Sequence, residues 1–230
     1  MNLHHNQRDQ QSSLSGKQGP GELRFGRSLI IGLTGGIATG KSTVAGMLTE
    51  LGARVISADA MVHEMLRPGT PVYKSVVEEF GREILDENRA IDRRKLAQIV
   101  FNDPDRRVRL EQILHPEVLS SIGDYVRAFR ERESGVLVLE IPLLIETSSQ
   151  GLVDKVLVVT AEQQTQIERL KYRYSINESQ ALLRIKAQMP LSDKVKLADW
   201  VISTEGSIES TREQVESVWR QAQKLLAQRK

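Results

Sequence analysis

The sequence contains no cysteine, which excludes disulfide bonds, thiolate metal sites and a cysteine nucleophile. This fits a reducing compartment, and we expect a cytoplasmic protein. No apolar run approaches the ~18 residues that a membrane-spanning helix needs, so no membrane partner is expected. Aromatic residues make up only 4% of the chain and the net charge is +2. Stacking platforms and a broad basic surface are therefore lacking, and we expect no nucleic-acid partner.

Residues 1–27 differ in composition from the rest of the chain. They are rich in Gln, Ser, Gly and Arg and show almost no apolar periodicity. A secretory signal would need a continuous apolar core, which this segment lacks. We therefore predict a disordered polar tail over residues 1–27.

The remaining chain alternates between short apolar runs and helical patterns, which is typical of an α/β protein. Buried strands are expected at 29–34, 54–57, 136–141, 153–159 and 200–203. Helices between the strands imply parallel pairing, because parallel strands need a crossover connection. We predict a doubly wound parallel sheet with helices on both faces, a three-layer α/β/α architecture.

The stretch from 61 to 133 is too long for a simple crossover and has a mostly helical pattern. Helix starts are expected at Pro71, at Asp92, after the Asp103-Pro104 pair and at Pro116, the last helix running through Arg132. We interpret this stretch as a helical insertion that forms one wall of a site. A second helical pair is expected at 163–173 and 178–188, with Asn177 as an N-cap, and a closing helix at 208–227.

The most informative segment matches the P-loop pattern G-x-x-x-x-G-K-[ST]. A buried strand precedes it and a helix follows it, so backbone N–H groups and the positive helix end converge on phosphates. In this chemistry Lys41 reaches the β- and γ-phosphates of a nucleoside triphosphate, and the Ser42 hydroxyl ligates Mg²⁺. The fold class is therefore that of the P-loop NTPases. The residues expected to bind the triphosphate are Gly35, Gly36, Ala38, Thr39, Gly40, Lys41, Ser42 and Thr43.

A P-loop identifies a nucleotide site but not a reaction, because GTPase switches, motors and small-molecule kinases share it. The N-K-x-D motif of guanine-specific switches is absent, and the chain is short for a motor. A kinase needs a group that orients the acceptor hydroxyl. Asp59 is the candidate, because it ends the second strand at the sheet edge that also carries the P-loop. It would accept the hydroxyl proton or hold Mg²⁺ through water; the structural alternative is an N-cap for a helix at 60–66.

Beyond the P-loop, an ordered series of motifs resembles the dephospho-CoA kinase family. The series comprises the LTGG-x-x-x-GKS loop, Ser57-Ala58-Asp59, Leu114-His115-Pro116, Glu140-Ile141-Pro142-Leu143-Leu144-Ile145-Glu146, the set Arg169, Arg173, Arg184 and Gln188, and Ala198-Asp199. It runs from Leu29 to the C-terminus and leaves only the polar tail outside. A P-loop alone is widely shared, whereas this ordered set over about 200 residues is much more specific.

The resemblance implies ATP-dependent phosphorylation of the ribose 3′-hydroxyl of dephospho-CoA, the last step of coenzyme A synthesis, with ATP and Mg²⁺ as cofactors. It also implies a nucleotide-binding core, a helical CoA-binding domain and a small lid. On this sequence the core covers 28–60, 135–162 and 192–230, the helical domain 61–134 and the lid 163–191. The oligomeric state, a monomer or a small homo-oligomer, has no signature in the sequence.

Further site residues follow from the resemblance. Arg169 and Arg173 are candidates for closing over the phosphates, since residues four apart share a helix face; a solvated basic face is the alternative. Arg173 is favoured as a catalytic residue because it lies at a helix end before a loop. His115, expected just before a helix start, either contacts substrate or fixes the turn. Glu140 ends a buried strand and is expected to hold the Mg²⁺ water shell beside Ser42.

Glu146 is expected only as a helix residue. The sequence departs from the family pattern at two places. Ser57 replaces the usual first acid of its triplet, so that acid is not essential in a working enzyme. Ser203-Thr204-Glu205-Gly206 replaces an Asn-containing loop near the adenine, which leaves base recognition to backbone groups. The alternative functions are another P-loop kinase, acting on nucleotides or metabolites, and a nucleotide-dependent binding switch with little turnover.

Overall fold

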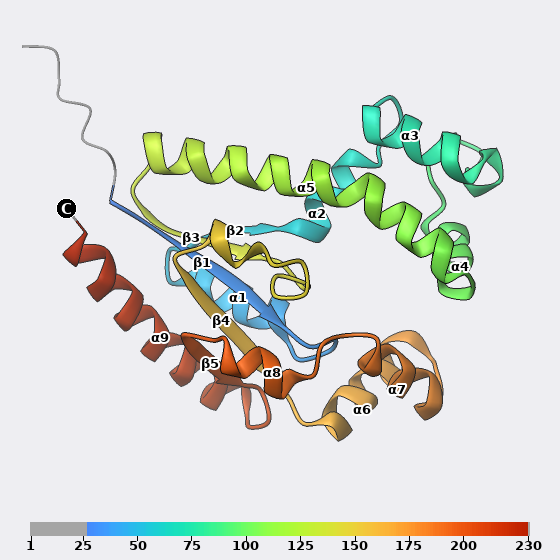
Figure 1. The fold of residues 1–230 in the computed structure, drawn as a ribbon. Helices are drawn as coiled ribbons and strands as arrows, with labels where there is room; N and C mark the ends of the chain where they lie inside the picture. The colour runs from blue at the N-terminus through green and yellow to red at the C-terminus, as the bar shows by residue number, and fades with distance from the viewer. Residues whose placement is uncertain (1–26, 230) are drawn as a thin grey trace, which may run out of the picture.

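A computed structural model describes residues 27–229, and the predicted polar tail lies outside the described residues except for Arg27 (Figure 1). The strands are β1 (Ser28–Gly35), β2 (Arg54–Ser57), β3 (Gly135–Glu140), β4 (Lys155–Thr160) and β5 (Trp200–Ser203). They pair in parallel in the order β2-β3-β1-β4-β5. The predicted parallel sheet is confirmed, and β1 with its P-loop lies at its centre.

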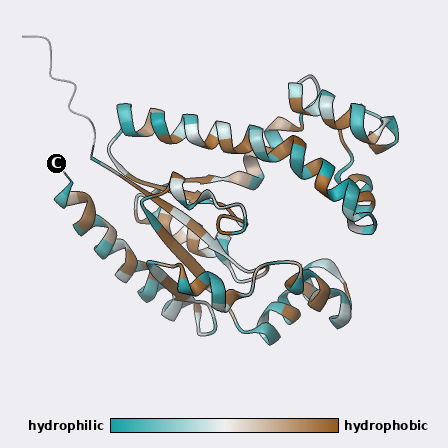
Figure 2. Ribbon diagram, in the orientation of Figure 1, coloured by the Kyte–Doolittle hydropathy of each residue, from teal (hydrophilic) through white to brown (hydrophobic). Residues whose placement is uncertain are grey.

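Residues of β1 alternate between two cores, which explains the layers. Leu29, Ile31 and Leu33 face a cluster shared with the helices α1 (Lys41–Glu50) and α9 (Ile208–Gln228). Ile30 faces a second cluster, shared with α5 (Pro104–Arg132). Because successive strand side chains point to opposite faces, an uninterrupted apolar run has a helical layer on each side. The buried apolar residues of α1, α9 and α5 pack on the sheet, whose central strands are largely brown in Figure 2, and the three-layer prediction is confirmed.

The remaining helices lie in the connections between strands, and only some of them begin at a side-chain cap. They are α2 (Ala58–Met65), α3 (Pro71–Phe80), α4 (Arg93–Asn102), α6 (Gln163–Tyr174), α7 (Glu178–Lys186) and α8 (Leu191–Lys196), with short 3₁₀ turns η1 (Arg82–Ile84) and η2 (Ser149–Leu152). Asp92 and Asp103 accept backbone N–H groups at the starts of α4 and α5. Asn177 and Gln180 form a reciprocal capping box at α7.

Helix α5 contradicts the predicted start at Pro116. It is a single helix of 29 residues with Pro116 inside it. A proline in a helix interior removes one backbone hydrogen bond and disfavours the helix, but tertiary packing can outweigh that cost. Here Ile122, Val126 and Phe129 bury the second half of α5 against the sheet. The first half packs on α3 and α4, so the helix is supported on both sides of Pro116.

Two smaller clusters lie away from the sheet. The insertion between β2 and β3 has its own core of Val72, Val76, Phe80, Ile84 and Leu96. Helices α6 and α7 share a separate cluster that also contacts the P-loop residues 37 and 38. These helices extend from the sheet on the side where β1 ends (Figure 1). Within residues 27–229, none of the helices has the length and apolar character required to cross a membrane.

Candidate active site

The P-loop turns sharply at the end of β1. Gly35 has φ 152°, and a Cβ there would overlap the carbonyl oxygen of Val159 on β4, so only glycine fits. Gly40 has φ 87°, and Ala38 adopts the left-handed conformation at φ 58°. Left-handed residues in a short loop aim successive N–H groups into one concavity, which binds anions. The geometry is that of a phosphate cradle at the N-terminus of α1.

Lys41 is folded back onto this loop. Its Nζ atom donates to the carbonyl oxygen of Gly36 at 2.7 Å and lies 3.5 Å from that of Gly35. Burial, together with the nearby ammonium of Lys194, lowers the pKa of Lys41 to about 8, against the opposing effect of the carboxylates of Glu140, Asp59 and Glu146. An anionic ligand in the cradle would offset this desolvation.

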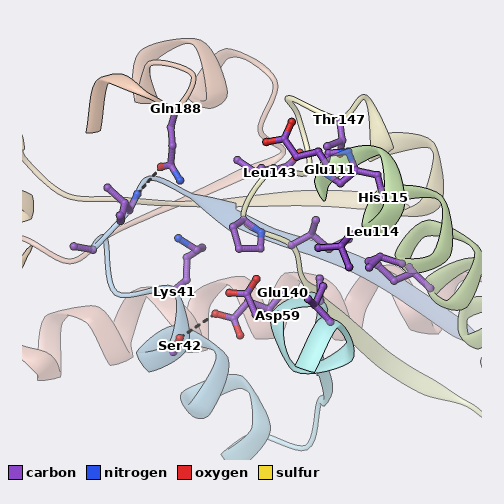
Figure 3. Close-up of a pocket in the computed structure, with 18 of the residues that line it drawn as sticks. Lys41, Ser42, Asp59, Glu111, Leu114, His115, Glu140, Leu143, Thr147 and Gln188 are labelled. Atoms are coloured by element: carbon purple, nitrogen blue, oxygen red, sulfur yellow. Dashed lines mark hydrogen bonds between the residues drawn. The ribbon is translucent and has the colours of Figure 1, made fainter. Parts of the chain in front are cut away.

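Ser42, Glu140 and Asp59 gather beside Lys41 (Figure 3). The Ser42 hydroxyl donates to Glu140 Oε1 at 3.0 Å, which joins the start of α1 to the end of β3. Asp59 is exposed and lines the same cleft from the first turn of α2. The N-cap of α2 is Ser57, so the alternative role of Asp59 as an N-cap is wrong. The helix begins two residues earlier than predicted and leaves the Asp59 carboxylate available to the cleft.

A cleft of about 730 Å³ opens between the P-loop, the Asp59–Glu140 edge and helix α5. Its far wall is largely apolar, formed by Leu110, Leu114, Val118, Leu119 and Ile122. The size and lining suit a small organic ligand.

His115 lines this cleft near Leu114 and Glu111 (Figure 3). It lies in the interior of α5, so the expected place just before a helix start is wrong. A position inside a helix removes the argument that His115 fixes a turn. Its contact with substrate stays a prediction.

A second cavity, of about 410 Å³, opens on the other side of the P-loop. Its lining includes Thr204, Gly206 and Ile208, from the loop after β5 and the start of α9. Glu205 points elsewhere: its carboxylate accepts from the Glu162 backbone N–H at 2.5 Å and from the Thr165 hydroxyl at 2.9 Å. Glu205, in the loop that departs from the family pattern, therefore anchors α6 rather than lining the cavity.

Both cavities share the P-loop residues 38, 40 and 43 and one lid-candidate side chain, Arg173. Arg173 is exposed and stacks over the Tyr174 ring at 5.4 Å. Arg169 differs, because it donates to the carbonyl oxygen of Ala38 at 3.1 Å and to both Thr204 oxygens at 2.9 Å. The predicted arginine pair thus separates into a fixed member, which braces the P-loop, and a solvent-facing member at the junction of the two cavities.

Three polar contacts to the P-loop were not predicted. Gln166 Nε2 donates to the Ile37 carbonyl oxygen at 2.6 Å, and Gln188 Oε1 accepts the Ile37 N–H at 2.7 Å. Lys194 Nζ donates to the Gly35 carbonyl oxygen at 3.3 Å. No local sequence signal marks these contacts, because each joins residues far apart in the chain. Glu146 belongs to the turn region after β3, so its prediction as a helix residue is wrong.

Ser42 and Glu140 fit a Mg²⁺ site that a ligand completes. Hydroxyl and carboxylate oxygens are the ligands that Mg²⁺ prefers, and Mg²⁺ usually keeps several waters and substrate oxygens. Within the described part of the chain, no group of three or more His, Cys, Asp or Glu residues is arranged to hold a metal. Ser42 and Glu140 are therefore better suited to a cation that binds together with a polyphosphate than to a metal ion that is held by protein ligands alone.

The parallel sheet, the P-loop and the adjoining acceptor-sized cleft define the class of P-loop kinases. The family model described as dephospho-CoA kinase matches residues 29–210. The chain belongs to the dephospho-CoA kinase family.

Similar proteins support this assignment. The dephospho-CoA kinase of Carboxydothermus hydrogenoformans is 48% identical over 186 residues, covering 81% of this chain and 90% of that protein. The Bacillus anthracis enzyme is 43% identical, covering 83% and 96%. Among solved structures, a Thermus thermophilus protein is 34% identical with a TM-score of 0.70, covering 84% and 97%. Dephospho-CoA kinase from Campylobacter jejuni is 26% identical with a TM-score of 0.59, covering 85% and 98%.

Proposed function

We propose that this protein transfers the γ-phosphoryl group of ATP to the ribose 3′-hydroxyl of dephospho-CoA, giving coenzyme A and ADP. The observation that carries this proposal is the meeting of two cavities at the P-loop, with Asp59 on one side. A kinase of two bulky substrates needs this arrangement, because donor and acceptor reach the transferring phosphoryl group from opposite directions. Family membership identifies the acceptor.

In this proposal the nucleoside of ATP occupies the cavity lined by Thr204 and Gly206, and its phosphates follow the loop amides. Lys41 turns from the Gly36 carbonyl oxygen to the β- and γ-phosphates and offsets the charge that develops during transfer. Ser42 and Glu140 would hold Mg²⁺, which would neutralise phosphate charge when bound. The Thr204 hydroxyl already donates to the Thr39 carbonyl oxygen at 2.9 Å, which leaves base selection to backbone groups and cavity shape.

Asp59 accepts or orients the proton of the attacking 3′-hydroxyl. It lies on the cleft side of the P-loop, at the end of the sheet where the acceptor enters. A carboxylate within hydrogen-bond reach of a hydroxyl orients it for in-line attack and takes up its proton as the new bond forms. The Asp59 carboxylate is available to the acceptor because it is exposed and because Ser57, not Asp59, is the N-cap of helix α2.

The helical parts supply substrate binding and closure. Residues 61–134 hold dephospho-CoA, with His115 contacting the ribose or phosphates and the apolar wall of α5 receiving the pantetheine arm. Residues 163–191 act as the lid, and Arg173 closes over the phosphates. Closure excludes water, which would otherwise accept the phosphoryl group in place of the ribose hydroxyl.

A coupled ADP-release assay with Mg-ATP, run with and without dephospho-CoA, tests this function. Stimulated ADP release, with a product heavier by one phosphate, is the expected result. The proposal would be rejected if the rate of ADP release were the same with and without dephospho-CoA. In that case nucleoside monophosphates and small alcohols would be screened as acceptors, which separates the alternative of another P-loop kinase from that of a binding switch.

A further inference from the structure

Lys194, on the short helix α8, is a fully buried lysine that lines neither cavity. Its Nζ atom contacts Glu146 Oε1 at 2.7 Å, the Pro142 carbonyl oxygen at 3.2 Å and the Gly35 carbonyl oxygen at 3.3 Å. All three ammonium hydrogens therefore have an acceptor. Burying an ammonium is costly unless it is paired and hydrogen-bonded, so a role beyond packing is worth seeking.

Glu146 is the carboxylate that forms an ion pair with Lys194. Its Oε1 atom accepts from Lys194 and, at 3.3 Å, from the Met189 backbone N–H, whereas Oε2 is buried and has no hydrogen-bond partner among residues 27–229. A carboxylate with an unsatisfied buried oxygen contributes little net stability, because desolvation opposes the attraction within a buried ion pair. Stability alone is therefore a poor explanation for the pair.

The two carbonyl groups that Lys194 contacts belong to neighbouring parallel strands, one at the end of β1 and the other just after β3. Gly35 begins the P-loop, and Pro142 follows Glu140 by two residues at the end of β3. The Thr34 hydroxyl donates to the same Pro142 oxygen at 2.9 Å, which tightens the junction. Lys194 thus ties the strand that carries the phosphate cradle to the segment that carries Glu140.

Residues 188–194, which include Lys194, lie alongside the P-loop and contact its successive residues. Gln188 accepts the Ile37 N–H, Leu191 lies so close to Gly36 that a Cβ there would be 3.3 Å from its Cγ, and Lys194 binds Gly35. These three side chains are spaced three apart where the chain returns from the 163–191 segment to the core. They contact three consecutive P-loop residues in reverse order, as a brace along the loop.

We propose that Lys194, charge-compensated by Glu146, is a positioning residue for phosphoryl transfer, which sets the P-loop relative to the Glu140 edge. It acts through the Gly35 and Pro142 carbonyl groups and touches neither substrate. When Lys41 turns towards the phosphates, the buried Gly35 carbonyl keeps a donor because Lys194 stays. Catalytic groups need placement to within a fraction of an ångström, and a displacement of about 1 Å can cost about 10²-fold in rate.

The test uses the full-length protein and substitutions of matched size. Lys194→Met removes the ammonium but leaves Glu146 as an unpaired buried charge. Lys194→Met combined with Glu146→Gln removes both charges and so separates positioning from charge burial. Lys196→Met is the control, since that lysine lies on the same helix with its side chain 74% exposed. For each variant, the urea midpoint, kcat, and the KM of ATP and of dephospho-CoA are measured.

We expect the double variant to regain the parent urea midpoint while kcat/KM for ATP stays about 10- to 100-fold low, with KM for dephospho-CoA within about threefold of the parent. Recovery of kcat/KM together with the midpoint would overturn the proposal, because the pair would then serve stability alone. So would a Lys194→Met variant with turnover within about threefold of the parent. The inference rests on the proposed function. The same assay tests that function separately, because it also measures the turnover of dephospho-CoA by the parent protein.

Discussion

At the scale of single residues, Asp59 is the side chain whose role is tested most directly. We expect Asp59→Asn to lower kcat by about 10²–10⁴, the range for loss of a base or orienting group, while ATP affinity changes little. Within residues 27–229 the exposed carboxylate makes no hydrogen bond or ion pair, so the urea midpoint should stay close to the parent value. Steady-state kinetics and ATP titration calorimetry provide the measurements. Glu64→Gln on the same helix is the control, and an Asp59→Asn loss below threefold would remove Asp59 from the mechanism.

Lys41 should destabilise the ligand-free protein. Burial and Lys194 lower its pKa from 10.5 to about 8, against the opposing effects of Glu140, Asp59 and Glu146. Between pH 8 and pH 10.5 the unfolded chain binds more protons than the folded chain, so the free energy of unfolding rises with pH in this range. Below pH 8 Lys41 is charged in both states, and the full destabilisation from burying its ammonium is present. We expect Lys41→Met to raise the free energy of unfolding at pH 7 by on the order of 2 kcal/mol.

Urea unfolding at pH 7 and at pH 10 checks this prediction, with the exposed Lys224→Met as the control. The gain from Lys41→Met should shrink towards zero at the higher pH, because Lys41 is then largely neutral in the folded protein. A constant gain at both pH values would show that packing, not charge burial, is responsible.

At the scale of elements, helix α6 carries two arginines whose substitutions should have different consequences. Arg173→Ala should lower kcat by about 10²–10³, as for loss of one charge-stabilising donor, with an unchanged urea midpoint because Arg173 is exposed. Arg169→Ala should lower both kcat and the midpoint, because it removes the donors to Ala38 and Thr204. Lys171→Ala on the same helix is the control. Equal midpoints for the two arginine variants would contradict the assignment of Arg169 as a brace.

Several predicted elements that rest on a local signal agree with the structure. Strands β2 and β5 have the predicted bounds, and the caps at Asp92, Asp103 and Asn177 are confirmed. The break at Pro116 is wrong, because contacts on both sides of the proline hold α5 together. Strand β4 begins two residues after its predicted start, since the Asp154 carboxylate accepts the Ile30 N–H at 2.8 Å just before the strand.

At the scale of the whole molecule, the separate core of the insertion should let it open independently of the sheet. Val76 and Val138 are both fully buried, the first in the insertion and the second in β3. We expect Val→Ala at either position to cost about 1–3 kcal/mol. In Val76→Ala, but not in Val138→Ala, the increase in amide hydrogen exchange should be limited to residues 71–115, and Val76→Ala should retain its affinity for ATP. Added exchange spread over the sheet in Val76→Ala would show one cooperative unit.

The sequence by itself determined the parallel α/β architecture, the P-loop with Lys41 and Ser42, the helix caps and the family. The P-loop and the caps depend on side chains a few residues apart, and the architecture and the family depend on the order of such local patterns along the chain, so a linear sequence contains them. Only the tertiary structure decided that Arg169 braces the loop while Arg173 stays open, that His115 faces the cleft from within a helix, and that Lys194 meets Glu146 under the P-loop. Buried polar contacts pair groups from distant segments, and their partners are set by how the layers pack, which no local pattern records.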